Sequence, residues 1–151
     1  MVPGLSNLSY EDRLRKLKLP TLSYRRLRGD MIECYKLLNN KYYFNEEDIL
    51  RLNHGSSTRG NSMKLCKFRA RLDIRKYSFS NRVVNIWNSL PDCVITAGTI
   101  FTFESRLDRY WKNQELVYNY NAILQTGTYK TLNPTQEELV SEADGLLPEI
   151  I

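Results

Sequence analysis

The sequence predicts a mainly α-helical protein: a small bundle of four to five short helices with one strand or hairpin and a disordered acidic C-terminal tail. Apolar residues recur at helical spacing in several segments, and one segment alternates with period two. Residues 133–151 are acidic and contain no aromatic side chain. The chain has 151 residues, 42% of them hydrophobic, which is enough for one domain with a modest core.

Two helices are predicted in the first part of the chain. Ser9 and Asp12 have the spacing of a capping box, at the start of a helix that Pro20 ends. Thr21 is expected to cap a longer helix that runs to about Asn39. Its apolar residues fall in one stripe about 100° wide, which predicts that this helix packs on a core. The stripe consists of Tyr24, Leu27, Met31, Cys34, Tyr35 and Leu38.

The middle of the chain is predicted to hold a short helix, a loop and a strand. The helix begins at Asn45 in the sequence NEEDILRL, because acids are favourable in a first turn, and the loop covers residues 53–62. From Cys66 to Arg75 apolar and polar residues alternate strictly, the pattern of a half-buried strand with a basic exposed face. The residues expected to face the core are Cys66, Phe68, Ala70, Leu72 and Ile74.

Two further helices are predicted before the tail. Ser80 is expected to cap a helix that Pro91 ends, and Thr99 is expected to cap a last helix. Trp87 and Trp111 fall on the apolar stripes of these helices, so both are expected in the core. The sequence ELVYNYNAILQTG that follows fits no single pattern.

Charge divides the chain near Lys112. Residues 1–112 contain 21 Lys and Arg against 11 Asp and Glu, a net charge of +10, whereas residues 113–151 contain one Lys and six acids, a net charge of −5. We therefore interpret residues 1–112 as a basic helical domain and residues 113–151 as an acidic, flexible tail. A charge asymmetry of this kind suggests a nucleic acid or a membrane surface as partner.

Several classes of protein are not expected from this sequence. No apolar run approaches the ~20 residues of a membrane-spanning helix, and the first residues lack the pattern of a signal peptide. Cys34, Cys66 and Cys93 have neither disulfide nor metal-ligand spacing, and we expect no metal and no cofactor. The simplest interpretation is an intracellular protein of the nucleus or cytoplasm without a membrane partner.

Basic side chains between residues 64 and 82 are the first group of candidate nucleic-acid-binding residues. Contacts from such residues to phosphates would give sequence-independent and salt-sensitive affinity. The alternative is a solvated face, or one paired with Asp73, with the acids at 46–48 or with the acidic tail. Four of them, Lys67, Arg69, Arg71 and Arg75, are expected to share the exposed face of the strand. The whole group is Lys64, Lys67, Arg69, Arg71, Arg75, Lys76 and Arg82.

Arg25, Arg26 and Arg28, in the second predicted helix, are the other candidate nucleic-acid-binding residues. Arg26 lies four residues before Asp30, and such a helix-surface pair contributes only ~0.3 kcal/mol but occupies the charge. A structural role and a binding role therefore both remain open for these arginines. Among the tyrosines, Tyr42, Tyr43 and Tyr77, which lie nearer loops, are the candidates for stacking on bases.

Three phrases of the chain resemble a known family. They are LSYEDRLRKLKLPTLSYRRLRGDMIECYKLL, STRGNSMKLCKFRARLDIRKYSFSNRVVNIWNSLP and TFESRLDRYW. In this order, over about residues 3–112, they resemble the conserved C-terminal region downstream of the reverse transcriptase domain in LINE-type, jockey-like non-LTR retrotransposon polyproteins. The resemblance implies a region that follows the polymerase thumb and helps to hold template RNA or target DNA during target-primed reverse transcription.

The catalytic part of that family has no counterpart in this sequence. A reverse transcriptase, an RNA-directed DNA polymerase, needs a Tyr/Phe-x-Asp-Asp turn whose carboxylates hold metal ions, and this chain contains no Asp-Asp pair. We therefore predict no catalytic residue and no enzymatic activity.

The sequence thus favours a non-catalytic nucleic-acid-binding accessory module derived from a transposable element, with RNA or DNA as partner and a reverse transcriptase domain as a further partner. Two alternatives remain open. One is a protein-interaction or scaffold fragment that packs on a missing polymerase thumb, and the other is a decayed remnant without function.

Overall fold

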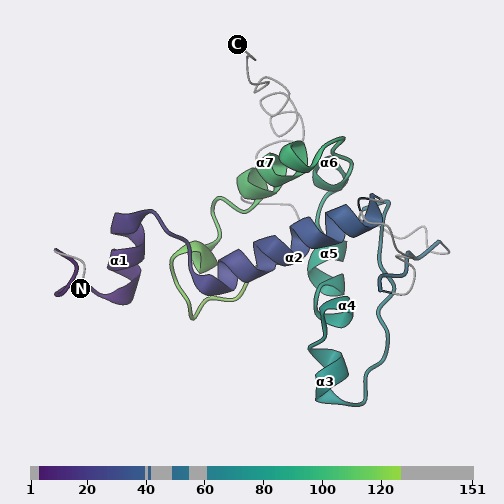
Figure 1. The fold of residues 1–151 in the computed structure, drawn as a ribbon, viewed down its shortest axis with the longest axis horizontal. Helices are drawn as coiled ribbons and strands as arrows, with labels where there is room; N and C mark the ends of the chain where they lie inside the picture. Colours follow the sequence, from purple (N-terminus) through teal and green to yellow (C-terminus); the bar gives the residue numbers. More distant parts are fainter. Residues whose placement is uncertain (1–3, 40, 42–48, 55–60, 127–151) are drawn as a thin grey trace, which may run out of the picture.

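The computed structural model describes residues 4–39, 41, 49–54 and 61–126 of the chain. These residues form a mainly helical fold, which confirms the predicted fold class (Figure 1). The elements are α1 (Tyr10–Leu17), α2 (Leu22–Leu38), α3 (Asp73–Lys76), α4 (Phe79–Arg82), α5 (Val84–Ser89), α6 (Asp92–Ile95), α7 (Ile100–Tyr110) and the 3-10 helix η2 (Glu115–Val117).

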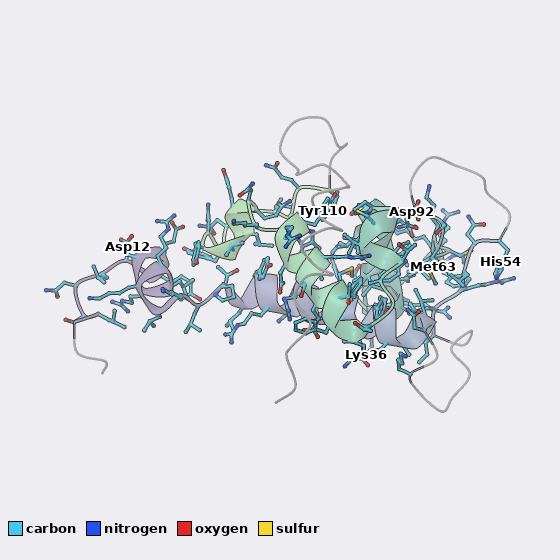
Figure 2. All side chains as sticks on the ribbon, turned by 90° about the horizontal axis from the view of Figure 1, so that it is seen from above. Asp12, Lys36, His54, Met63, Asp92 and Tyr110 are labelled. Carbon is cyan, nitrogen blue, oxygen red and sulfur yellow. The ribbon has the colours of Figure 1, made fainter. Side chains whose placement is uncertain are left out.

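Helix α1 begins with the predicted capping box. Ser9 Oγ accepts a hydrogen bond from Asp12 N at 3.2 Å and donates one to the Asp12 carboxylate at 2.6 Å. The helix ends at Leu17, because Lys18 takes the left-handed conformation with φ 54° and its N–H bonds to earlier carbonyls. Seen from above, Asp12 on α1 and His54 lie at opposite ends of the molecule (Figure 2).

Helix α2 is the central element of the fold. Thr21 caps it as predicted, accepting a hydrogen bond from Tyr24 N at 3.2 Å. Helices α6 and α7 lie on one side of α2, while α5, α4 and α3 form a column on the other (Figure 1). The Tyr35 ring stacks on Phe103 of α7 with ring centroids 4.4 Å apart. The core therefore sits where α2, α5 and α7 meet.

Both tryptophans lie in the core, as predicted. Trp87 on α5 and Trp111 at the end of α7 are 0% and 2% exposed. Thr99 caps α7 as predicted and accepts from Thr102 N at 3.1 Å. The short helix α6 was not predicted and occupies the crossing between α5 and α7.

The core continues past Lys112. Leu116 and Leu124 are buried, and the segment that carries them returns to the start of α2. There Thr21 N donates to Val117 O at 2.8 Å and Thr21 Oγ1 donates to Leu116 O at 2.6 Å. The division at Lys112 therefore marks a change in charge rather than the edge of the packed body. The predicted disorder of the tail beyond Thr126 falls on residues outside the described ones.

The predicted strand from Cys66 to Arg75 is wrong. In the described residues the extended pairing is limited to one antiparallel bridge between Leu52 and Leu65, and the chain from Cys66 to Leu72 is irregular before α3 begins. Strict alternation describes side chains, but a strand also needs a neighbouring strand for its backbone groups. No such neighbour follows the bridge in the described residues, so the supposed core face is largely open: Phe68, Leu72 and Ile74 are 49%, 69% and 84% exposed.

Two predicted helices also differ from the structure. The helix expected after Ser80 is two short helices, α4 and α5, and Ser78 rather than Ser80 precedes the first. Ser80 Oγ instead lies 3.2 Å from Ser78 Oγ. The helix expected from Asn45 falls mostly on residues outside the described ones, and its last four positions, 49–52, are not helical.

Candidate nucleic-acid interface

Residues 64–82, here called the basic arm, project from the core beside α5. The irregular segment 64–72 runs along the column of α3, α4 and α5 and turns back into α3 at its far end (Figure 1). A hollow of about 550 Å³, here called the arm hollow, lies between this segment and the column. The cations lining it are Lys67, Arg69, Lys76 and Arg82, and its aromatic side chains are Phe68 and Tyr77.

Side-chain amides attach the first part of the arm to α5. Asn88 Oδ1 accepts from Leu65 N at 2.8 Å, and Asn88 Nδ2 donates to Leu65 O at 3.0 Å. Just before the arm, the Trp87 indole donates to Met63 O at 2.8 Å, and Asn61 Nδ2 donates to Trp87 O at 2.8 Å. These bonds satisfy the backbone of Leu65 as a sheet partner would, which explains why an irregular segment is stable here.

A second attachment lies next to Met63. Ser62 N and Ser62 Oγ both bond to Asp92 Oδ1, at 2.7 and 2.8 Å. Met63 and Asp92 accordingly lie at the same end of the molecule in Figure 2. The start of the arm is therefore held to α6 as well as to α5.

Lys67 and Arg69 bring positive charge to the segment side of the arm hollow. Both side chains are exposed. Lys67 Nζ donates to Asn85 Oδ1 of α5 at 3.1 Å, and this neutral partner does not compensate the ammonium charge. In the described part of the chain, neither residue forms an ion pair with an acid.

Lys76 and Tyr77 lie on the opposite side of the arm hollow, at the corner between α3 and α4. Asn81 Nδ2 and Ser78 Oγ each donate to Arg75 O at 2.8 Å and so fix this corner. Tyr77 is 63% exposed, and the Lys76 ammonium lies 5.2 Å from the centroid of its ring. The corner therefore presents an aromatic ring and a cation together.

Arg82 lines the same hollow, but its charge is already compensated. Its Nε and Nη2 donate to the two carboxylate oxygens of Asp30 on α2, at 2.9 and 2.7 Å. This hydrogen-bonded carboxylate raises the pKa of the Arg82 guanidinium above its ordinary value. The expected pair between Arg26 and Asp30 is therefore wrong, because Asp30 turns to a partner on α4 instead.

Arg28 is likewise a structural residue. Its Nε and Nη2 donate to the carboxylate of Asp108 on α7 at 2.6 and 2.8 Å, with Glu104 3.5 Å away. The hydrogen bond to Asp108 raises the pKa of the Arg28 guanidinium. Arg28 thus ties α2 to α7.

The remaining predicted residues do not line the arm hollow. Arg71 and Arg75 are exposed elsewhere on the arm, and Arg25 and Arg26 are exposed on α2. Lys64 is half-buried, and its carbonyl accepts from Asn53 N at 2.8 Å. Arg26 lies at a separate hollow of about 470 Å³ between α2 and residues 116–126.

The predicted common face of Lys67, Arg69, Arg71 and Arg75 is therefore wrong. Without a strand, the structure instead gathers two cations from segment 64–72 with two from α3 and α4. Phe68 was expected in the core, and Asn85 was not expected to contribute. The positions of Phe68 and Asn85 at the hollow depend on how segment 64–72 folds against α5. The alternating sequence pattern does not predict that packing.

Other chemistry in the described residues is limited. In these ranges no three His, Cys, Asp or Glu side chains gather as metal ligands. Burial raises the pKa of the Cys34 and Cys93 thiols, which keeps both protonated and weakly nucleophilic at neutral pH. The helices of the described part are all too short or too polar to cross a bilayer.

Comparisons of the chain with protein-family models, with curated proteins and with solved structures find no match.

Proposed function

We propose that this chain is a non-catalytic nucleic-acid-binding accessory module whose basic arm grips the phosphate backbone of RNA or DNA. The observation that carries the proposal is the arm hollow, where Lys67, Arg69 and Lys76 converge without an acidic partner among the described residues. Converging cations repel one another, so a polyanion between them is favourable.

The composition of the arm supports the same function. Its seven basic side chains and one acid stand in a stretch of 19 residues, and it projects away from the core (Figure 1). Because Arg82 is neutralised by Asp30, the cations at the hollow that have no acidic partner among the described residues are Lys67, Arg69 and Lys76. Phosphate contacts from these side chains would release counterions and carry no base preference.

The resemblance to the region downstream of a non-LTR retrotransposon reverse transcriptase also supports the proposal. The basic arm falls within its second phrase, STRGNSMKLCKFRARLDIRKYSFSNRVVNIWNSLP. In this proposal the module holds template RNA or target DNA while a separate reverse transcriptase domain performs the chemistry.

The test compares two triple variants of equal charge. In the first, Lys67, Arg69 and Lys76 are each replaced by Gln; in the control, Lys41, Arg51 and Lys112, which are exposed outside the arm, are replaced by Gln. Fluorescence anisotropy with a 12-nucleotide RNA and a 12-base-pair DNA is measured over a salt series. We expect the arm variant to bind more weakly and to lower the slope of log K against log salt by about two for the RNA and nearly three for the duplex DNA, whereas the control keeps most of its slope.

No binding at low salt by the unchanged chain would refute the proposal. Equal losses in the two triple variants would also refute it, because affinity would then follow net charge rather than the arm. Both variants should keep the helical circular dichroism of the unchanged chain, since all the replaced side chains are exposed.

A second candidate function rests on the apolar side chains of the arm. Phe68, Leu72, Ile74 and Tyr77 are 49%, 69%, 84% and 63% exposed, which is a large apolar area on one projecting segment. A protein-interaction module that docks on a reverse transcriptase domain would use them. Under this alternative, Leu72→Asn with Ile74→Asn abolishes binding to such a domain and leaves nucleic-acid affinity unchanged.

A further inference from the structure

The arm hollow combines aromatic rings with its cations. Phe68 and Tyr77 both line it, and their side chains are 49% and 63% exposed. Neither ring is part of the buried core cluster, so neither is needed to fill the interior. An exposed aromatic pair beside lysine and arginine is the combination that binds single strands, in which bases stack on rings and phosphates meet cations.

Each ring lies near a hydrogen bond from or to α4 or α5, and the backbone at Tyr77 is held directly. Phe68 follows Lys67, whose ammonium is bonded to Asn85 of α5 at 3.1 Å. Tyr77 sits at the corner that Asn81 holds through its bond to Arg75 O at 2.8 Å. A stacking ring on a corner held in this way, as Tyr77 is, loses less conformational entropy on binding than a ring on a mobile loop.

The size of the hollow fits one or two nucleotides better than a double helix. Its volume of about 550 Å³ lies within the range of pockets that enclose small organic ligands, ~300–1,000 Å³. In a duplex the faces of the bases are covered by their stacked neighbours, and only their edges are open in the grooves. A ring in this hollow can therefore reach a base face only in an unpaired strand.

We infer that the arm hollow binds unpaired nucleotides of a single-stranded nucleic acid, with a base on the Phe68 or Tyr77 ring and phosphates at Lys67, Arg69 and Lys76. The Lys76 ammonium lies over the Tyr77 ring, 5.2 Å from its centroid, and so places a positive charge at that ring. This inference rests on the proposed function and adds the strandedness of the ligand.

The test removes the rings and keeps the charges. Phe68→Leu and Tyr77→Leu are compared with Phe101→Leu, a matched control because Phe101 is 60% exposed on α7 away from the arm. The probes are a 12-nucleotide single strand, an abasic single strand of the same length and charge, and a duplex. We expect each arm variant to bind the single strand about tenfold more weakly, with no change for the abasic strand, the duplex or the control.

The unchanged chain should also prefer the single strand to the abasic strand, and Tyr77→Phe should keep that preference because the ring remains. The inference would be overturned if the unchanged chain bound the normal and the abasic single strand equally, or if both Leu variants kept full affinity for the normal strand. Either result would overturn it even if the triple variant of Lys67, Arg69 and Lys76 still loses salt-dependent binding. If the unchanged chain showed no salt-dependent binding to any of the probes, the proposed function itself would be overturned.

Discussion

Arg82 on α4 and Asp30 on α2 share two hydrogen bonds, at 2.9 and 2.7 Å, across 52 residues of sequence. The Asp30 side chain is only 10% exposed, so the carboxylate is largely desolvated where it makes this contact. The pair fixes the base of the basic arm to the central helix. It also removes one cation from those that compete for an anionic ligand.

We therefore predict that Arg82 contributes to stability more than to binding. Arg82→Gln should lower the free energy of unfolding by ~1–3 kcal/mol, because the nearly buried Asp30 carboxylate loses both charged donors. The slope of nucleic-acid affinity against salt should change little. Urea unfolding measures the first effect and anisotropy the second.

A double-mutant cycle provides the control for this pair. Asp30→Asn combined with Arg82→Gln should cost less than the sum of the two single changes, because the second replacement no longer leaves a charge unpaired. Strict additivity would show that the two side chains do not stabilise the fold through each other.

Arg28 should behave in the same way at the other side of α2. Arg28→Met removes the two hydrogen bonds to Asp108 and should destabilise the protein by ~1 kcal/mol, a modest value because the Asp108 side chain is 46% exposed. The neighbouring exposed residue Arg25 is the control, and Arg25→Met should stay within ~0.5 kcal/mol of the unchanged chain. An equal loss in both variants, measured by urea unfolding, would contradict the structural role of Arg28.

The raised pKa of the Tyr24 phenol leads us to predict a loss of stability at high pH. Burial, followed by the nearby Asp108 carboxylate, raises the pKa of the Tyr24 phenol to about 12, while Arg28 opposes this shift. Between pH 10 and 12 the unfolded chain has lost this proton and the folded protein keeps it, so the free energy of unfolding falls as pH rises through this range. Below pH 10 the contribution is complete.

Tyr24→Phe isolates this contribution from the other alkaline titrations. Unfolding by urea at about pH 9 and about pH 11.5 should show a decrease that is ~1–2 kcal/mol smaller in the variant than in the unchanged chain. An identical decrease in the two proteins would mean that the Tyr24 phenol titrates alike in the folded and unfolded states.

Asn88 should control the order of the basic arm. Asn88→Ala removes both hydrogen bonds to Leu65, so the Leu65 amide should exchange with solvent at least tenfold faster in hydrogen-exchange measurements. Asn88→Asp keeps an acceptor for Leu65 N but places a second acceptor opposite Leu65 O. The exchange rate of the Leu65 amide in Asn88→Asp should therefore lie between the rates in the unchanged chain and in Asn88→Ala. An unchanged rate in both variants would contradict the role of Asn88 in holding the arm.

Local signals in the sequence predicted three of the helix starts. The caps at Ser9, Thr21 and Thr99 were found because each depends on an oxygen and an N–H only three residues apart in the chain. The burial of Trp87 and Trp111 followed from helical periodicity in the same way. These features need no knowledge of distant segments.

Distant partners account for what the sequence did not predict. The alternating residues from Cys66 to Arg75 have the side-chain pattern of a strand, but a strand forms only beside another backbone, and the described pairing stops after Cys66 N bonds to Arg51 O at 2.7 Å. Arg26 was the cation at i,i+4 spacing from Asp30 on the helix, but the fold supplied Arg82 from α4. The arm hollow could not be predicted because it depends on the irregular course of segment 64–72 and on the pairing of Arg82 with Asp30.

The amide contacts at the start of the arm also bear on which substitutions this chain tolerates. In a sheet, the ladder is made by the backbone, so most exchanges of side chain preserve it. Here the N–H and carbonyl of Leu65 are held by the Asn88 side chain and Trp87 O by the Asn61 amide, so single substitutions at 61 or 88 can loosen the start of the arm while α2 and α7 stay packed. A library of random variants selected only for folding should therefore retain the core residues of α2, α5 and α7 while varying freely at Lys67 and Arg69, and one selected for an attached arm should also keep Asn61 and Asn88.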